Sequence, residues 1–170
     1  VRMFADLDVT MLISSSFSKS FSLYGERVGA LTVVAGDKEE AGRVLSQLKR
    51  TIRTNYSNPP THGGTLVSTI LNDAGLFAEW DRELAGMRDR IRLMRKQLVD
   101  KIKEHGATQD FSFVLKQRGM FSYSGLTSQQ VDRLREEHGV YAISTGRICV
   151  AALNSRNIDV VAKAIAAVLK

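Results

Sequence analysis

Residues 14–29 read SSSFSKSFSLYGERVG and follow a short apolar run at residues 11–13. The segment places the amine of Lys19 among serine hydroxyls, with Arg27 eight positions further along. Hydroxyls and a guanidinium can bind an anion together, and the guanidinium suits the geometry of a phosphate. A lysine at such a site can react if burial or neighbouring positive charge lowers its pKa. The residues alone allow two interpretations, a solvated loop or a reactive lysine beside a bound anion.

The composition is that of a globular protein with its own core. The chain has 170 residues, of which 44% are hydrophobic and 25% are charged. Its single cysteine, Cys149, excludes an intramolecular disulfide and a cysteine-cluster zinc site, and it favours a reducing, cytoplasmic location. No apolar run is long enough to cross a bilayer, so we expect no membrane partner. A net charge of +6 fits nucleic acid, a membrane surface or small anions, and does not choose between them.

Strands and helices interleave, which predicts the α/β or α+β class. Asp37 is the predicted N-cap of a helix, because Glu40 follows at capping-box spacing. Gly106 is the predicted stop of a later helical stretch. The predicted elements are strands at 9–16 and 30–35, a helix at 38–53, one interrupted helix or two in sequence at 61–105, short pieces at 112–115 and 119–123, a helix at 128–137, paired strands at 140–144 and 147–151, and a helix at 158–169.

The helical stretch at 61–105 carries an apolar stripe at spacings of three and four. The stripe consists of Leu84, Met87, Ile91, Met94, Leu98 and Ile102. A basic face containing Arg88, Arg92, Arg95 and Lys96 could bind nucleic acid, but acidic residues are interspersed with it. We interpret that face as solvated and expect no nucleic-acid partner. The character of the connections changes near residue 86, which predicts two domains, 1–86 and 87–170.

The motif in the first segment resembles a known family. Ser16-Phe17-Ser18-Lys19, followed by Phe21, Leu23, Tyr24 and Glu26-Arg27-Val28-Gly29, is similar to the cofactor-lysine segment of fold type I pyridoxal-phosphate aminotransferases, in the aspartate and aromatic amino acid subgroup. The resemblance implies that the chain is α/β, with the end of the large cofactor-binding domain followed by the α+β small domain. The stretches GMFSYSGL and RICVAALN look closer to the aromatic (tyrosine) branch.

The resemblance also implies roles for four residues of the motif. Lys19 would bind the aldehyde of pyridoxal 5'-phosphate through a Schiff base, and its released amine would move a proton at the substrate α-carbon. Ser16, Ser18 and Arg27 would hold the cofactor phosphate. The protein would supply binding, orientation and electrostatics, since the cofactor ring is the electron sink.

Arg53 precedes TNYSNPP, which resembles the family's Arg-x-x-x-Ser-Asn-Pro-Pro segment. By resemblance this segment reaches the active site of the other subunit of a homodimer. Arg53 would meet the side chain of a dicarboxylic substrate or yield space to an aromatic one, and Ser57 and Asn58 would line the pocket. Without this resemblance, Arg53 would be interpreted as a basic residue that complements a helix C-terminus.

Two residues of the C-terminal half complete the predicted site. Arg147 in STGRICVA matches the family's Gly-Arg pair and would bind the substrate α-carboxylate through two parallel hydrogen bonds. Its alternative interpretation is an arginine that faces water at a strand edge. Phe121 in RGMFSYSGL would lie near the substrate, and core packing is the equal alternative for it.

Together these residues predict an enzyme that transfers an amino group from an amino acid to a 2-oxo acid. The alternative is a cofactor-binding, non-catalytic aminotransferase-like domain of a transcription regulator, although no helix-turn-helix segment is evident. Family segments that should precede residue 1 are not found, so we expect this chain to be a C-terminal piece that is inactive alone. No metal site is predicted.

Overall fold

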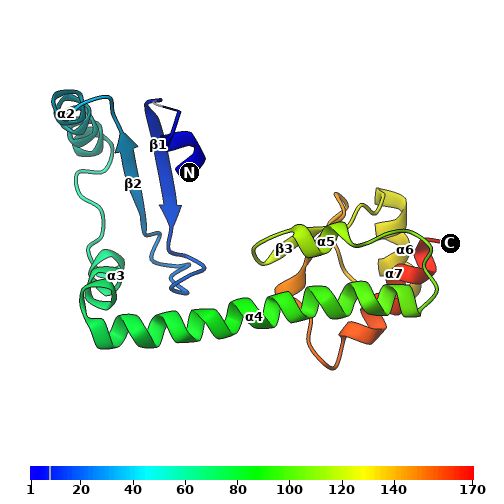
Figure 1. Cartoon of the computed structure of the whole chain (residues 1–170). Coiled ribbons are helices and arrows are strands. Elements are labelled where there is room, and N and C mark those ends of the chain that lie inside the picture. Colours follow the sequence, from blue (N-terminus) through cyan, green and yellow to red (C-terminus); the bar gives the residue numbers. More distant parts are fainter. Residues whose placement is uncertain (8) are drawn as a thin grey trace. The chain divides into compact units, whose positions relative to one another are not determined.

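A computed structural model describes residues 1–7 and 9–170, in two compact units, Val1–Asp81 and Arg82–Lys170 (Figure 1). The helices are α1 (Arg2–Ala5), α2 (Lys38–Asn55), α3 (His62–Asn72), α4 (Ala74–Glu104), α5 (Phe113–Lys116), α6 (Ser128–His138), the 3-10 turn η1 (Val150–Ala152) and α7 (Ile158–Val168). The strands are β1 (Met11–Ser16), β2 (Gly29–Val34), β3 (Phe121–Tyr123) and β4 (Arg147–Cys149).

The first unit contains an antiparallel hairpin of β1 and β2, paired from Met11 opposite Val34 to Ser16 opposite Gly29. The connection between the two strands is the loop of residues 17–28, which carries the predicted lysine motif. A Cβ atom at Gly29 would lie 2.6 Å from the carbonyl oxygen of Ser15, so only glycine fits at this pair. The hairpin therefore holds both ends of the motif loop at fixed, adjacent positions.

Helix α2 begins where the sequence predicts. The Asp37 carboxylate accepts a 2.7 Å hydrogen bond from the backbone N–H of Glu40. The Glu40 side chain in turn accepts from the N–H of Gly36, one residue before the N-cap, so the reciprocal bond of a capping box is displaced by one position. The helix ends at Asn55, ahead of the double proline at residues 59–60.

The helical stretch at 61–105 consists of two helices, as one of the two predicted arrangements has it. They are separated at Asp73, whose carboxylate accepts hydrogen bonds of 2.9 Å from the N–H groups of Gly75 and Leu76 at the start of α4. Helix α4 then continues through the division between the two units. It ends at Glu104, and Gly106 adopts the left-handed backbone conformation (φ +84°) that terminates it, as predicted.

The hydrophobic core lies in the second unit. The C-terminal half of α4 contributes Met94, Leu98 and Ile102 from the predicted stripe, whereas Met87 is half-exposed. Their partners in the core cluster are Phe111, Val114, Leu126, Val131, Leu134, Val150, Leu153, Ile158, Ala162, Ala164, Ile165 and Val168. At about 25 cal/mol per Å² of buried apolar surface, this cluster is the main source of stability in the unit.

The predicted pairing of strands at 140–144 and 147–151 is wrong. Strand β4 pairs antiparallel with β3, and Tyr123 lies opposite Arg147. Residues 140–143 belong to no strand; the N–H of Ile143 makes a 3.5 Å contact with the carbonyl of Arg147, and Gly146 closes a turn onto Ile143. A strand-like apolar pattern therefore does not identify which segments pair.

Candidate active site

Two serines of the motif form a small hydroxyl cluster at the end of β1. The Ser16 hydroxyl donates to the Ser18 hydroxyl at 3.1 Å, and it accepts from the backbone N–H of Ser18 at 3.3 Å. Ser18 is buried, at 5% exposure, whereas Ser16 is exposed. These contacts order two neighbouring hydroxyl groups at the edge of the motif loop, where they can donate to an anion.

Lys19 and Arg27 both contact Tyr24. The Lys19 amine lies 4.3 Å from the centroid of the Tyr24 ring, and a guanidinium N–H of Arg27 donates to the Tyr24 carbonyl oxygen at 3.0 Å. Arg27 adopts a left-handed backbone conformation (φ +53°), which is strained for a residue with a side chain. Sequence reasoning assigned no role to Tyr24. Its position five residues after the lysine, in a turn, was the available signal.

Aromatic packing supports the motif loop. The Phe21 ring stacks on Trp80 with centroids 4.7 Å apart, and Phe17 meets Phe21 edge-on. The indole N–H of Trp80 donates to the carbonyl oxygen of Ser20 at 2.8 Å. Sequence reasoning missed this anchor. Its signal was a lone tryptophan in the polar stretch AEWDRE, which is a place where an aromatic ring needs a contact.

Helix α3 packs directly against the residues on either side of Arg27. A Cβ atom at Gly63 would lie 2.9 Å from Cβ of Glu26 and 3.1 Å from Cβ of Val28. Gly63 is buried at this contact, whereas a Cβ at the neighbouring Gly64 would meet nothing within 4 Å. The close approach of this helix restrains the backbone that carries the Arg27 guanidinium.

The predicted substrate residues of the first unit lie together at the C-terminal end of α2, with Arg53 in its last turn and Ser57 and Asn58 just after it. Arg53 donates to the Ser57 hydroxyl at 2.7 Å. Ser57 has a left-handed backbone (φ +68°), and its N–H bonds the carbonyl of Ile52 in the last turn of the helix. Asn58 follows in the same exposed turn. The three polar side chains of Arg53, Ser57 and Asn58 thus belong to one ordered surface segment.

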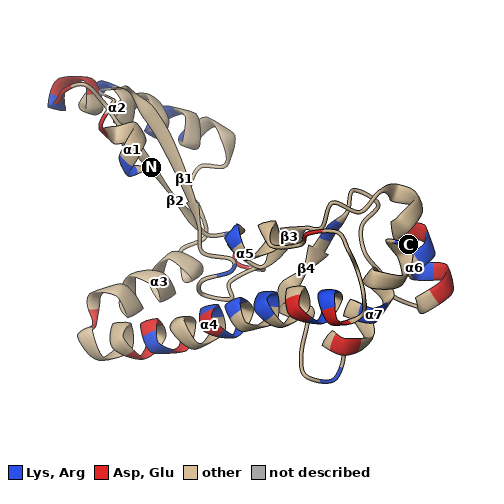
Figure 2. Cartoon of the chain, turned by 45° about the vertical axis from the view of Figure 1, so that its right-hand side comes forward, with Lys and Arg blue, Asp and Glu red and all other residues tan. Residues whose placement is uncertain are grey.

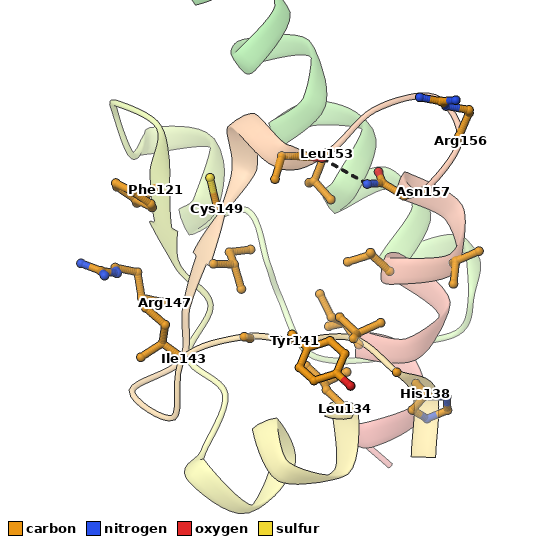
Figure 3. Close-up of a pocket in the computed structure, with 18 residues that line it drawn as sticks. Phe121, Leu134, His138, Tyr141, Ile143, Arg147, Cys149, Leu153, Arg156 and Asn157 are labelled. Carbon is orange, nitrogen blue, oxygen red and sulfur yellow. Dashed lines mark hydrogen bonds between the residues drawn. The ribbon is translucent and has the colours of Figure 1, made fainter. Parts of the chain in front are cut away.

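The other predicted substrate residues, Arg147 and Phe121, lie side by side on β4 and β3. The guanidinium carbon of Arg147 lies 4.9 Å from the centroid of the Phe121 ring. Both residues line a cavity of about 660 Å³ in the second unit (Figure 3). Its other walls are largely apolar and include Tyr141, Ile143, Val160 and Ile165. Phe121 is 41% exposed, which argues against the alternative that it is simply a core residue.

The charges of these candidate sites are available for a ligand. Within residues 1–7 and 9–170, none of the ion pairs involves Lys19, Arg27, Arg53 or Arg147. A cluster of donors with no carboxylate attached is suited to an anion. In the same described part of the chain, no group of three or more His, Cys, Asp or Glu residues is arranged to hold a metal ion.

Sequence comparison now assigns the family. The sequence model of the family described as aminotransferase class I and II matches residues 1–165, and the chain belongs to this family. It is 62% identical over 169 residues to the aspartate aminotransferase of Pseudomonas aeruginosa and 55% identical to the tyrosine aminotransferase of Klebsiella pneumoniae, in each case over 99% of this chain. These names do not favour the alternative of a regulator domain.

Structural comparison agrees. The crystal structure of the aromatic-amino-acid aminotransferase from Burkholderia pseudomallei, covalently bound to pyridoxal phosphate, superimposes with a TM-score of 0.94 at 68% sequence identity. The match covers 99% of this chain and 42% of that protein. The predicted fold, that of fold type I transferases of mixed helix and strand, is confirmed.

The match covers only part of each relative's length. The chain spans 42% of the Pseudomonas protein and 43% of the Klebsiella protein. In the part of the chain that the structure describes, no helix combines the length and the apolar character needed to cross a membrane.

Proposed function

We propose that the protein containing this chain is a pyridoxal-phosphate-dependent aminotransferase. It moves an amino group between an aromatic or dicarboxylic amino acid and a 2-oxo acid. The observation that carries the proposal is the arrangement around Lys19. Its amine, which forms no ion pair among the described residues, shares one short segment with the Ser16 and Ser18 hydroxyls and the Arg27 guanidinium. Family membership supports the same reaction class.

The residues of the motif loop fit pyridoxal phosphate. Ser16, Ser18 and Arg27 offer hydroxyl and guanidinium donors of the kind that bind a phosphate. Among the described residues Lys19 forms no ion pair, so its amine is available to an aldehyde. When bound, pyridoxal phosphate supplies the electron sink for the reaction at the amino acid. The Lys19 amine then holds and moves the proton at the substrate α-carbon.

Substrate binding is proposed for the arginines. The Arg147 guanidinium, supported on one face by the Phe121 ring, binds the α-carboxylate through two parallel hydrogen bonds. Arg53, with Ser57 and Asn58, acts at the other end of the substrate in the second subunit of a homodimer. Fixing the two ends of the amino acid orients its α-carbon, and orientation alone can lower a barrier by about 7–11 kcal/mol.

The proposal extends to domains and location. Residues 1–86 are the C-terminal part of the cofactor-binding domain, and residues 87–170 are the small domain. The division of the described chain at Asp81 and Arg82 lies close to this boundary and supports it. A single cysteine supports a reducing compartment, and we propose a cytoplasmic enzyme.

The test is chemical labelling of the full-length protein. The purified protein is loaded with pyridoxal phosphate, reduced with borohydride, digested and mapped by mass spectrometry. The cofactor should be attached at Lys19, and Lys19→Ala should lose both the label and amino transfer. The matched control is Lys49→Ala on α2, which should keep both. A label on another lysine, or full turnover by Lys19→Ala, would contradict the proposal.

A further inference from the structure

Arg95 is a charged residue inside the second unit. Its side chain is 4% exposed, although it was expected on the solvated basic face of α4. That expectation is wrong for Arg95, since the residue continues the apolar stripe at the spacing of Ile91 and Leu98. Acidic residues are interspersed with other basic residues of the helix at the surface, as Figure 2 shows along α4.

All the hydrogen bonds of the Arg95 guanidinium go to one short segment. Its Nε donates to the Ser122 hydroxyl at 3.2 Å, and one Nη donates to the carbonyl oxygens of Gly119 and Phe121, the latter at 3.2 Å. These partners are neutral, and burial together with the nearby charge of Arg118 lowers the pKa of Arg95. A buried charge costs free energy that an apolar side chain of similar size would not, so packing alone does not account for a guanidinium here.

The bonded segment, residues 119–122, leads into β3 and includes part of the strand's outer edge, the side away from β4. Along its inner edge β3 pairs with β4, and hydrogen bonds from Ser124 to Gly146 and from Ala151 to Met120 flank the pair. On the outer edge, Arg95 donates a hydrogen bond to the carbonyl oxygen of Phe121. The side-chain amide of Gln117 exchanges two hydrogen bonds, of 2.8 and 3.0 Å, with the backbone of Tyr123. The side chains of Arg95 and Gln117 thus make hydrogen bonds to the β3 backbone of the kind that a third strand would make.

The fixed strand carries the aromatic ring that faces Arg147. Tyr123 lies opposite Arg147 in the register, and Phe121, two residues before it, projects from the same face of the sheet. The position of the Phe121 ring follows from its backbone, whose carbonyl oxygen is the acceptor for Arg95. A continuous set of contacts therefore leads from Arg95 through Phe121 to the guanidinium of Arg147.

We propose that Arg95 is a positioning residue for carboxylate recognition. It holds β3 so that Phe121 keeps Arg147 in the orientation that receives two parallel hydrogen bonds. This inference rests on the proposed function, in which Arg147 binds the substrate α-carboxylate. Arg95 touches neither substrate nor cofactor and acts only through Phe121 and Arg147.

The test uses the full-length protein loaded with pyridoxal phosphate. Single-turnover absorbance against amino acid concentration gives the apparent affinity and the maximal rate separately. Arg95→Met should weaken the apparent affinity roughly tenfold and change the maximal rate by less than about threefold. Arg95→Lys, which keeps the charge and can donate to one carbonyl, should recover part of the loss. The matched control is Arg92→Met, an exposed position of α4 bonded to Asp89, and it should leave both values unchanged.

The two proposals are separated by a double-mutant cycle. If Arg95 acts through Arg147, then Arg95→Met should weaken the affinity no further in an Arg147→Ala background. Equal losses with and without Arg147 would overturn the positioning role. An Arg147→Ala protein with normal affinity would overturn the proposed role of Arg147 itself. If Arg95→Met fails to fold, the same cycle is run with Arg95→Lys, and an unchanged affinity in that folded variant overturns the inference.

Discussion

The indole N–H of Trp80 donates a 2.8 Å hydrogen bond to the carbonyl oxygen of Ser20, the residue that follows Lys19. The same indole stacks on Phe21. A residue sixty positions away in sequence therefore fixes the backbone next to the proposed catalytic lysine. The loop is more than a connection between two strands, because its conformation depends on α4.

Replacing Trp80 by Phe should remove this hydrogen bond and retain most of the aromatic stacking. We expect the free energy of unfolding to fall by about 1–2 kcal/mol, the usual range for one lost hydrogen bond and a smaller ring. Because Trp80 is the only tryptophan, denaturant unfolding should be followed by far-UV circular dichroism rather than by fluorescence. Phe77→Leu, a change at an exposed residue whose ring is tilted against Trp80 with centroids 5.6 Å apart, should cost less. Equal losses in the two variants would show that the Ser20 bond contributes nothing.

Adjacent glycines of α3 should respond in opposite directions to alanine. Gly63→Ala would bring a methyl group to 2.9 Å from Glu26 and 3.1 Å from Val28. Overpacking of this kind costs about 1–3 kcal/mol and outweighs the gain in helix propensity. Gly64→Ala has open space and should stabilise the protein by up to about 1 kcal/mol. Thermal or denaturant unfolding of both variants checks the pair, and a stabilised Gly63→Ala would mean that α3 does not press on the Arg27 segment.

Low pH and high pH should both reduce the contribution of Asp159 to the free energy of unfolding. Hydrogen bonds from Lys101 and then His105 lower the pKa of Asp159, and the bond to Asp159 raises the pKa of Lys101. A lowered carboxyl pKa contributes stability above the unfolded value of about 3.9, and that stability is lost as pH falls through the folded value. A raised lysine pKa contributes stability below about 10.4, and it is lost as pH rises through the folded value.

The difference in denaturation midpoint between the natural protein and Asp159→Asn should therefore be constant from about pH 5 to 9 and shrink on both sides. The measurement is a series of urea titrations across pH. Lys101→Met, which leaves the His105 contact with Asp159 in place, should lose the alkaline change while keeping part of the acid one. Since Asp159 is exposed and Lys101 and His105 are only half-buried, added salt should reduce the effect. A pH-independent difference would contradict the assigned cause.

Local signals predicted the helices well. Asp37 and Gly106 mark helix ends in the sequence, and both do so in the structure, because capping is decided by neighbouring residues. Strand pairing was not local in this way. Residues 140–144 have an extended, apolar pattern, but β4 finds its partner in β3, more than twenty residues earlier. Only the tertiary structure reveals that choice.

The members of the candidate site are proposed from the resemblance, whereas the residues that support them were not predicted. The resemblance identified Lys19, Arg27 and Arg147, because the motif spacing is fixed. It did not reveal that Trp80 holds the loop, since the sequence marks Trp80 as a residue that needs a contact but does not identify a partner sixty residues away. Arg95 was assigned to the solvated face because of its charge. Its spacing within the apolar stripe was the better indicator, and burial followed the spacing.

The Gln117 side chain has a consequence for behaviour in concentrated solution. A strand with free N–H and C=O groups along its side is a template on which another polypeptide can add. At Tyr123 the amide of Gln117 already occupies those groups, and Arg95 occupies the carbonyl at Phe121. The outer edge of β3 is thus closed to a further strand at these two residues, so any added strand would have to pair along β4.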